Sequence, residues 1–175
     1  MRPAGRQIIR ASIDGFHRPR TQRYRRGSLS ARGYYEDSFD HDSLRRALLE
    51  PLGPGGDRRY RTVAFDFRAD SPVESPVREA PADALLVFDG VFLQRPELRG
   101  SWELRVFVTV EPEESLRRAL ERDLELLGSR EDVERRYRQR YLPGQQLYLV
   151  EAQPLEHADF VVANDDPTRP HLSTR

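Results

Sequence analysis

Residues 84–90 read Ala-Leu-Leu-Val-Phe-Asp-Gly, a short apolar run that ends on an acid and a glycine. A run of this length is typical of a strand covered on both faces, as in a parallel sheet. Working outward from it, the patterning predicts further strands at 7–12, 61–67, 104–110 and, as the last one, 159–163. Helical patterns separate several of these strands. The alternation predicts βαβ units and an α/β fold with a mostly parallel sheet.

The first predicted helix begins near Asp40, an N-cap type of residue, and ends at Pro51 and the glycine-rich run after it. The second covers 113–127, with a proline in its first turn and Gly128 at its end. Residues 17–37 and 68–83 show little periodicity, so two long loops are predicted there.

The third helix opens at Ser129-x-x-Asp132, which resembles a capping box. It is expected to continue to about Tyr141, where Pro143 breaks it and starts another helical segment.

The composition excludes several kinds of chemistry. All 29 basic residues counted as Lys or Arg are Arg, so no Schiff-base lysine and no Walker A lysine lies within these residues. No cysteine is present, which excludes disulfides, a thiolate nucleophile and Cys–zinc sites. The longest apolar run is far too short to span a bilayer, and the N-terminus lacks a signal-peptide pattern. A cytoplasmic protein without a membrane partner is therefore predicted.

The formal charge is zero but unevenly placed. Residues 1–32 hold nine Arg and one acid, Asp14, so this segment carries 9 − 1 = +8 and the remainder carries −8. Such a basic arm favours an anionic partner, such as phosphate, nucleotide or nucleic acid. The aromatic side chains within and just after it could stack on a base. A basic arm without a binding role is the alternative reading.

Two acids follow predicted strands, Asp14 after the first and Asp89 after the apolar run. In open α/β sheets, ligands sit beyond the carboxyl ends of the strands. A carboxylate there can accept a proton from a substrate hydroxyl or hold Mg²⁺. Each could instead simply cap the next turn.

Arg118 and Arg122 are four residues apart on the 113–127 helix, so they are expected to project together, away from its leucine stripe. Guanidinium groups so placed could close on phosphates. A solvated face balanced by neighbouring acids is the other interpretation.

Several short segments, taken in order, resemble the motifs of the uridine kinase-like branch of the P-loop kinases, which includes phosphoribulokinase and pantothenate kinase relatives. The segments are Ile13-Asp14-Gly15-Phe16-His17, Tyr34–His41, Ala64-Phe65-Asp66-Phe67, Phe88-Asp89-Gly90-Val91, Arg118-x-x-x-Arg122-Asp123, Arg140-Tyr141-x-Pro143 and Ala158–Val162. The lid segment has one residue more between its arginines than the family pattern. The resemblance covers about residues 6–166.

This resemblance implies ATP- and Mg²⁺-dependent phosphorylation of a nucleoside hydroxyl, of the uridine or cytidine type. By resemblance, Asp14 is the general base and Asp89 helps to place Mg²⁺. The transferring phosphate is covered by Arg118 and Arg122. The acceptor pocket is lined by His17, Tyr35 and Phe65.

The implied fold is a P-loop NTPase-like three-layer α/β/α domain over residues 1–175, with a helical lid at about 112–152. The family pattern begins with a strand and the loop G-x-x-x-x-G-K-[ST], and neither has a counterpart here. The first strand and phosphate loop are thus expected to be missing, and activity is expected to be weak or absent.

Two other functions stay open: a non-catalytic nucleic-acid or phosphate binder that uses the basic arm, and a pseudo-kinase. The kinase interpretation itself calls for a small hydroxyl acceptor rather than nucleic acid. Acceptor identity and oligomeric state, including a homo-oligomer, are left open by the sequence.

Overall fold

The computed structural model describes residues 5–174. Its contacts divide the chain into two units. Unit 1 combines the residues up to 25 with residues 37–93, and unit 2 combines residues 26–36 with the residues from 94 onward.

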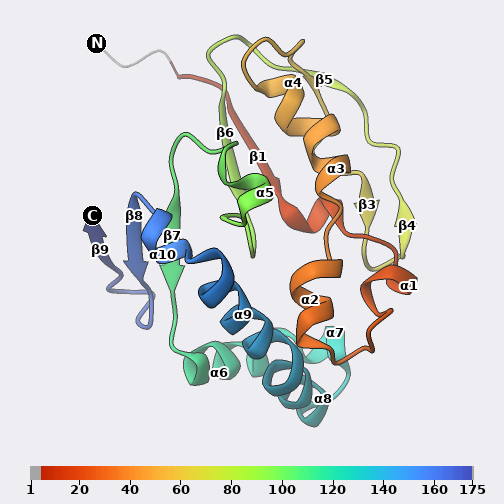
Figure 1. Ribbon diagram of the computed structural model, residues 1–175, viewed down its shortest axis with the longest axis vertical. Coiled ribbons are helices and arrows are strands. Elements are labelled where there is room, and N and C mark those ends of the chain that lie inside the picture. The colour runs from red at the N-terminus through yellow and green to blue at the C-terminus, as the bar shows by residue number, and fades with distance from the viewer. Residues whose placement is uncertain (1–4, 175) are drawn as a thin grey trace. The chain divides into compact units, whose positions relative to one another are not determined.

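A parallel pair of strands forms the centre of unit 1. Strand β1 (Ile8–Ser12) pairs with β6 (Leu85–Asp89), with Ile8 opposite Leu85 and Ser12 opposite Asp89 (Figure 1). The β-branched and apolar residues of both segments suit this pairing. The strands predicted at 7–12 and 84–88 are confirmed, and so is their parallel direction.

The expectation that the 84–88 strand is covered on both faces is wrong. Its side chains alternate in exposure, with Leu85 42% and Val87 53% exposed. On β1, Ile9 and Ala11 are buried while Ile8 is exposed. Successive side chains point to opposite faces of a strand, so in unit 1 only one face of this pair is packed.

One helical segment follows the sequence-level signals closely. The side chain of Asp40 accepts a hydrogen bond from the Ser43 backbone N–H, which caps the helix as predicted. The segment comprises α3 (His41–Leu44), the π-helical turn η2 (Arg45–Leu49) and α4 (Glu50–Leu52). Its end lies one residue beyond Pro51.

The strand predicted at 61–67 is not formed as one element. Four two-residue strands stand in this region, β2 (Arg59–Tyr60), β3 (Phe65–Asp66), β4 (Ser71–Pro72) and β5 (Arg78–Glu79). They pair antiparallel, β2 with β5 and β3 with β4. The connecting residue Ala64 donates its backbone N–H to the Gly15 carbonyl instead of extending a ladder. A proline in β4 also removes one ladder donor.

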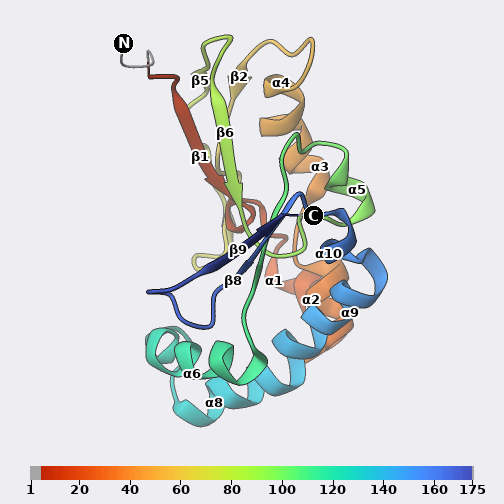
Figure 2. The same ribbon diagram turned by 90° about the vertical axis from the view of Figure 1, so that its left-hand side faces the viewer.

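Unit 2 contains a second, separate sheet. Strand β7 (Val106–Thr109) pairs parallel with β8 (Phe160–Ala163) (Figure 1). Strand β8 also pairs antiparallel with β9 (His171–Thr174) (Figure 2). The strands at 104–110 and 159–163 are confirmed. The prediction that the latter is the last strand is wrong, because β9 follows it. The α/β class is confirmed, with its parallel pairs in two small sheets.

The helices of unit 2 are listed in chain order: α2 (Ala31–Asp37, whose last residue belongs to unit 1), α5 (Pro96–Arg99), α6 (Pro112–Arg122), α7 (Leu124–Leu127), α8 (Arg130–Arg136), the π-helical turn η3 (Tyr137–Tyr141), α9 (Leu142–Ala152) and α10 (Pro154–His157). Leu116, Ala119 and Leu120 of α6 pack against Val133 and Tyr137 in one apolar cluster. Leu116, Leu120 and Leu127 of the leucine stripe predicted for 113–127 therefore pack together, but Leu124 is 39% exposed, and the single helix predicted there is divided into α6 and α7 at Asp123.

Two predicted caps are confirmed in this unit. The Ser129 side chain accepts a hydrogen bond from the Asp132 backbone N–H and opens α8. Gly128 ends α7 with a φ of 95°, a backbone conformation that favours glycine.

The predicted break at Pro143 does not occur, because the helix continues through η3 into α9. In η3 the Leu142 N–H bonds to the Tyr137 carbonyl, five residues back. Such a widened turn accommodates a proline, which has no N–H to donate and would crowd a regular α-helical turn. Pro143 does stand in the first turn of α9, as expected.

The loop predicted at 17–37 contains two helices, α1 (Arg20–Arg23) and α2. Ser30 stabilises the start of α2, since its hydroxyl accepts the Gly33 N–H and its carbonyl accepts the Tyr34 N–H. Across residues 5–174, no helix is both long and apolar enough to cross a membrane.

Candidate functional site

Asp14 stands immediately beyond β1, in the short 3-10 helix η1 (Ile13–Phe16). The Ser12 hydroxyl accepts the Asp14 backbone N–H at 3.3 Å and caps this turn. The Asp14 side chain is 63% exposed. Its backbone is thus held at the strand end while its carboxylate stays open to a ligand, which is what a proton acceptor for a bound hydroxyl requires.

Asp89 is the last residue of the neighbouring strand. It pairs with Ser12, and Ser12 lies two residues before Asp14 in the chain. Its side chain is exposed. Gly90 follows with a φ of 147°, and a Cβ there would lie 2.2 Å from Ile13 Cγ2. The glycine lets β6 end directly against η1. The two acids predicted to share one sheet edge therefore follow adjacent parallel strands.

His17 is held between two aromatic rings, Phe39 at 4.6 Å and Phe67 at 5.0 Å between ring centroids. Its Nδ1 lies 3.1 Å from the Ser38 carbonyl oxygen, and its Nε2 lies 3.5 Å from Asp14 Oδ1. A carbonyl can only accept, so Nδ1 carries a hydrogen in this arrangement. The ring is only 12% exposed and so offers little surface to a ligand; the contact of His17 with an acceptor stays a prediction.

Phe65 belongs to the same unit but is buried, with 7% of its surface exposed. It pairs with Pro72 in the β3–β4 ladder. The preceding residue, Ala64, bonds to Gly15, so this strand is fastened to the Asp14 turn. Phe65 shapes that wall of unit 1; its contact with an acceptor stays a prediction.

Tyr35 belongs to unit 2, where it is 4% exposed. The Arg95 guanidinium lies 4.5 Å from its ring centroid, and Tyr148 packs at 6.3 Å. Burial raises the pKa of the Tyr35 hydroxyl. Its predicted place beside a nucleoside is not tested by these contacts.

Arg118 and Arg122 also belong to unit 2, and they do not share a binding partner. Arg118 donates to Glu114 at 2.7 Å and to the carbonyls of Asn164 and Asp165, both at 2.8 Å. Arg122 donates to both Asp123 carboxylate oxygens and to the Tyr137 hydroxyl. These bonds raise the pKa of Arg122, the contact with Asp123 contributing most. A phosphate would have to replace these partners or add to them.

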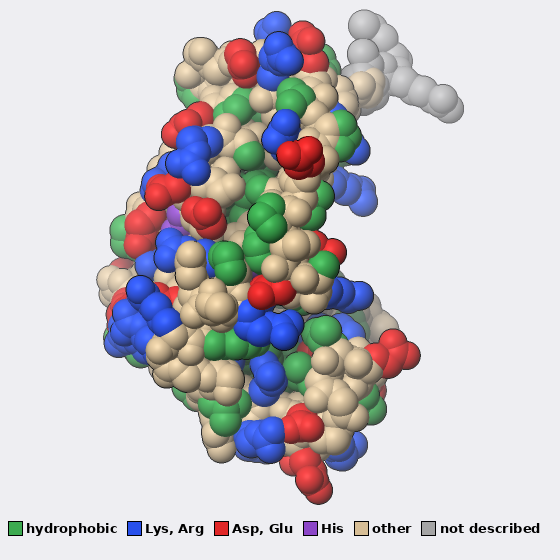
Figure 3. Space-filling model, turned by 90° about the vertical axis from the view of Figure 1, so that its right-hand side faces the viewer, with side chains coloured by type: hydrophobic (Ala, Val, Ile, Leu, Met, Phe, Trp, Pro, Cys, Tyr) green, Lys and Arg blue, Asp and Glu red, His purple; other side chains and the backbone are tan. Residues whose placement is uncertain are grey.

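Four arginines of the basic arm form ion pairs with acids. Arg23 is buried and bonds to Asp70 at 3.0 Å, while Arg26 pairs with Glu36 at 2.6 Å. Arg25 pairs with Asp37, and Arg32 pairs with Glu36 and Glu151. Figure 3 shows red and blue side chains interspersed on the face it presents. Part of the excess positive charge of residues 1–32 is therefore neutralised within the chain; the first four residues lie outside the described part.

Asp14 and Asp89 could serve a Mg²⁺ ion that keeps waters and takes further oxygens from a phosphate, because Mg²⁺ commonly uses only one or two carboxylates. Within the described part of the chain, no group of three or more His, Cys, Asp or Glu side chains could hold a metal. The pair of acids fits such an ion; an all-protein cage is not present there.

These residues provide only part of an ATP-binding site. The sequence contains no G-x-x-x-x-G-K-[ST] loop. The run Gly53-Pro54-Gly55-Gly56 follows α4 as a turn, and a Cβ on Gly56 would lie 2.2 Å from the Pro51 carbonyl oxygen. That glycine serves close backbone packing rather than a phosphate cradle.

The supporting residues around Asp14 were not found by sequence reasoning. Ser12 caps its turn, and Phe39 and Phe67 hold its histidine neighbour. Serine before Ile-Asp-Gly is an N-cap signal that could have been read. The aromatic sandwich joins residues far apart in sequence, and no local pattern announces it.

No protein-family model matches the chain. Among solved structures, the chain is similar to one described as that of a possible uridine kinase from Bacillus stearothermophilus. The TM-score is 0.66 and the identity 21%, and the match covers 91% of this chain and 74% of that one. At this identity the likeness shows the fold alone: the chain shares the α/β architecture of that structure.

Proposed function

We propose that this chain is a uridine kinase-like phosphotransferase component that binds a nucleoside hydroxyl and activates it with Asp14. The observation that carries the proposal is the exposed Asp14 carboxylate, fixed beyond β1 beside Asp89 at the end of β6. The likeness in fold to the Bacillus protein supports the same assignment.

Asp14 is the general base of the proposed reaction. Its carboxylate accepts the proton of the acceptor hydroxyl as that oxygen bonds to the γ-phosphorus of ATP and the bond from this phosphorus to the departing ADP breaks. The His17 ring packs beside this carboxylate, with its Nε2 atom 3.5 Å from Oδ1. Phosphoryl transfer depends mainly on positioning, so a base held by a capped turn suits it.

Asp89 is proposed to hold Mg²⁺, directly or through water. When bound, the ion supplies positive charge to phosphate oxygens. We assign ATP as the phosphoryl donor by the family resemblance, and no lysine-bearing phosphate loop for it lies among these 175 residues. Transfer by the chain as given is accordingly expected to be weak.

Helices α6 to α9 correspond to the proposed lid at about 112–152. For Arg118 to reach a phosphate, its bonds to the Asn164 and Asp165 carbonyls have to open or be shared. Arg122 would likewise exchange part of its contact with Asp123. Both arginines are proposed as phosphate ligands, and Tyr35 and Phe65 as acceptor contacts, as the family resemblance implies.

Two measurements test the proposal. Equilibrium dialysis with labelled uridine and cytidine measures acceptor binding by the chain and its Asp14→Asn variant, and we expect equal affinities. Phosphoryl transfer from ATP and Mg²⁺ is then followed in a chain extended by a strand and a G-x-x-x-x-G-K-[ST] loop. There, Asp14→Asn should lower turnover by about a hundredfold or more, as expected for loss of a general base.

Asp83→Asn is the matched control, because it makes the same isosteric change at an exposed acid before β6. It should leave binding and turnover unchanged. Failure of the chain to bind either nucleoside would remove the acceptor assignment. Near-normal turnover in Asp14→Asn would remove the base assignment.

A further inference from the structure

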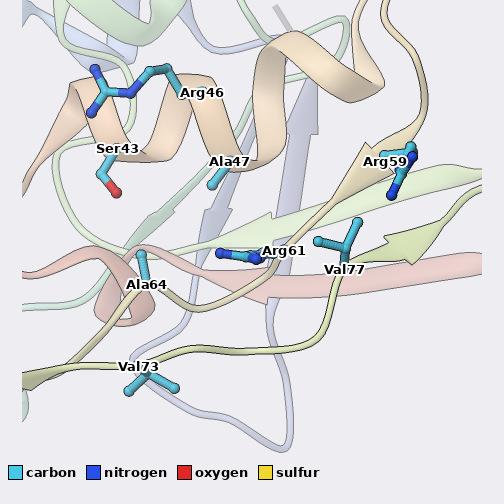
Figure 4. Close-up of a pocket in the computed structure, with 8 residues that line it drawn as sticks. All are labelled: Ser43, Arg46, Ala47, Arg59, Arg61, Ala64, Val73 and Val77. Carbon is cyan, nitrogen blue, oxygen red and sulfur yellow. The ribbon is translucent and has the colours of Figure 1, made fainter.

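Unit 1 contains a pocket of about 350 Å³ away from the Asp14 carboxylate. A volume of this size lies within the range of small-molecule sites. Figure 4 shows the helix α3–η2 on one side and the β2–β5 region on the other. The lining residues are Ser43, Arg46, Ala47, Arg59, Arg61, Ala64, Val73 and Val77.

Three arginines and no acid line this pocket. All three arginines, Arg46, Arg59 and Arg61, are exposed. None of their side chains forms a hydrogen bond or an ion pair with residues 5–174. By contrast, the adjacent Arg45 pairs with Asp42 at 3.2 Å. Three uncompensated guanidinium groups around one hollow create a local positive potential that attracts an anion.

The acids nearest along the chain are used otherwise or lie outside the pocket. Asp57 accepts the backbone N–H of Arg59 at 2.9 Å. Glu79 is opposite Arg59 in the β2–β5 ladder, but it does not line the pocket and forms no ion pair with Arg59. The positive charge of the lining is therefore available to a ligand.

The remaining lining is apolar except for one hydroxyl. Ala47 comes from the helix side, while Ala64, Val73 and Val77 come from the chain between β2 and β5. Figure 4 shows Val73 on the side opposite the helix, with Arg61 between it and Ala47, and Val77 beside Arg61 on the side of Arg59. A ligand here meets guanidinium groups and aliphatic carbon together, which suits an anion attached to a small carbon skeleton.

Backbone hydrogen bonds hold the pocket walls in place. The Arg61 N–H donates to the Ala47 carbonyl at 2.8 Å and ties the strand side to the helix. The Val73 N–H donates to the Ala64 carbonyl at 2.9 Å, which joins the segment that bears both valines to the segment that bears Ala64. The pocket is therefore formed before a ligand arrives, which lowers the ordering cost of binding.

We propose that this arginine pocket binds a phosphate monoester of a small organic molecule. The Arg61 guanidinium, which Figure 4 shows between Arg46 and Arg59, binds the phosphate; Arg46 and Arg59 add positive potential from the two ends of the lining, and the valines contact the carbon portion. Guanidinium pairs well with phosphate through parallel N–H···O bonds, and a dianion matches several positive charges better than one carboxylate does. The site is additional to the acceptor site proposed at Asp14.

Isothermal titration calorimetry on the 175-residue chain tests this, with phenyl phosphate, inorganic phosphate and phenol as probes at fixed ionic strength. Phenyl phosphate should bind more tightly than inorganic phosphate, and phenol should not bind measurably. Arg61→Gln should weaken phenyl phosphate binding by about tenfold, the effect of losing a charged hydrogen bond. Arg46→Gln and Arg59→Gln should act in the same direction.

Arg78→Gln is the matched control, since Arg78 is an exposed arginine of β5 that does not line the pocket. It should bind phenyl phosphate like the unaltered chain. Equal weakening by Arg78→Gln and Arg61→Gln would mean attraction by net charge alone and would overturn the proposal. Binding unaffected by the three pocket variants, or no binding of phenyl phosphate, would overturn it as well. Circular dichroism checks that each variant is folded.

Discussion

The Nε2 atom of His17 lies 3.5 Å from Oδ1 of Asp14, three residues earlier in the chain. The other ring nitrogen faces the Ser38 carbonyl, and the rings of Phe39 and Phe67 pack against the imidazole. The imidazole is thus part of the packed interior, while the carboxylate it faces is open. The exposed candidate base, Asp14, therefore has the mostly buried His17 ring as its neighbour.

His17→Ala should therefore reduce stability. Removing a packed ring between two phenylalanines leaves a cavity, and the free energy of unfolding should fall by about 1–3 kcal/mol. Urea denaturation followed by circular dichroism measures the change. His171→Ala in the exposed strand β9 is the control and should stay within about 0.5 kcal/mol. Equal stability of the two variants would show that the sandwich does not support this turn.

Gly90→Ala tests the close approach of β6 to η1. The new Cβ would lie 2.2 Å from Ile13 Cγ2 on a backbone with φ of 147°, so we expect a loss of about 1–3 kcal/mol. Gly100→Ala is matched to it, because a Cβ there meets nothing within 4 Å and its φ is −72°. That variant should be neutral or slightly more stable. Thermal unfolding of both variants distinguishes a required glycine from a tolerated one.

The contribution of Glu114 to the stability of the fold depends on pH and is lost in acid. Hydrogen bonds from Arg117 and Arg118, with that from Arg117 contributing more, lower the pKa of Glu114 from 4.5 to about 2. A carboxyl whose pKa is lowered in the folded state stabilises the fold above about pH 4.5, and this contribution disappears as the pH falls toward 2. Glu114→Gln should be less stable than the unaltered chain at pH 7, with the difference vanishing near pH 2.

Urea titrations at stepped pH values measure that difference. Glu125→Gln is the control, since Glu125 is exposed on α7 and has no side-chain ion pair within the described residues. Its difference from the unaltered chain should be small and nearly flat with pH. A difference for Glu114→Gln that does not shrink in acid would contradict the assignment of these ion pairs.

Tyr148→Phe removes a buried acceptor. The Tyr148 hydroxyl accepts the Gln94 backbone N–H at 2.9 Å, so the variant leaves that donor unsatisfied and should lose about 1–2 kcal/mol. Burial raises the pKa of Tyr148 to about 12, and the variant should lack the corresponding late step in an alkaline ultraviolet titration.

Tyr141→Phe is the companion variant, because no hydrogen bond of the Tyr141 hydroxyl is present in the structurally described chain. It should change stability by less than about 0.5 kcal/mol. Equal losses in the two variants would indicate that the rings, and not the Tyr148 hydroxyl, account for the effect.

The features predicted correctly from the sequence are mostly local. Asp40 and Ser129 cap helices, and Gly128 ends one, because each acts on backbone groups within a few residues. The apolar runs at 7–12 and 84–88 form parallel strands, which places Asp14 and Asp89 after neighbouring strand ends. These relations need only chain periodicity and the alternation of strands with helices.

Other features were decided by contacts between distant residues. The exposure of Leu85 and Val87 depends on what packs against each face, which an apolar run does not specify. Helix α2 forms in an irregular, arginine-rich stretch where Arg32 reaches Glu151, 119 residues away. Arg118 could be placed on its helix from spacing, but its bonds to Asn164 and Asp165 could not.

By itself, the sequence determined the α/β class, the helix caps and the carboxylates at the strand ends, since these follow from short-range backbone chemistry. The tertiary structure alone decided which arginines are paired and which are not. Arg23 is buried and forms an ion pair with Asp70. By contrast, Arg46, Arg59 and Arg61 line one pocket, and no carboxylate lines it. The physical reason is that an arginine's long side chain finds its partner in three dimensions, and its neighbours along the chain do not specify that partner.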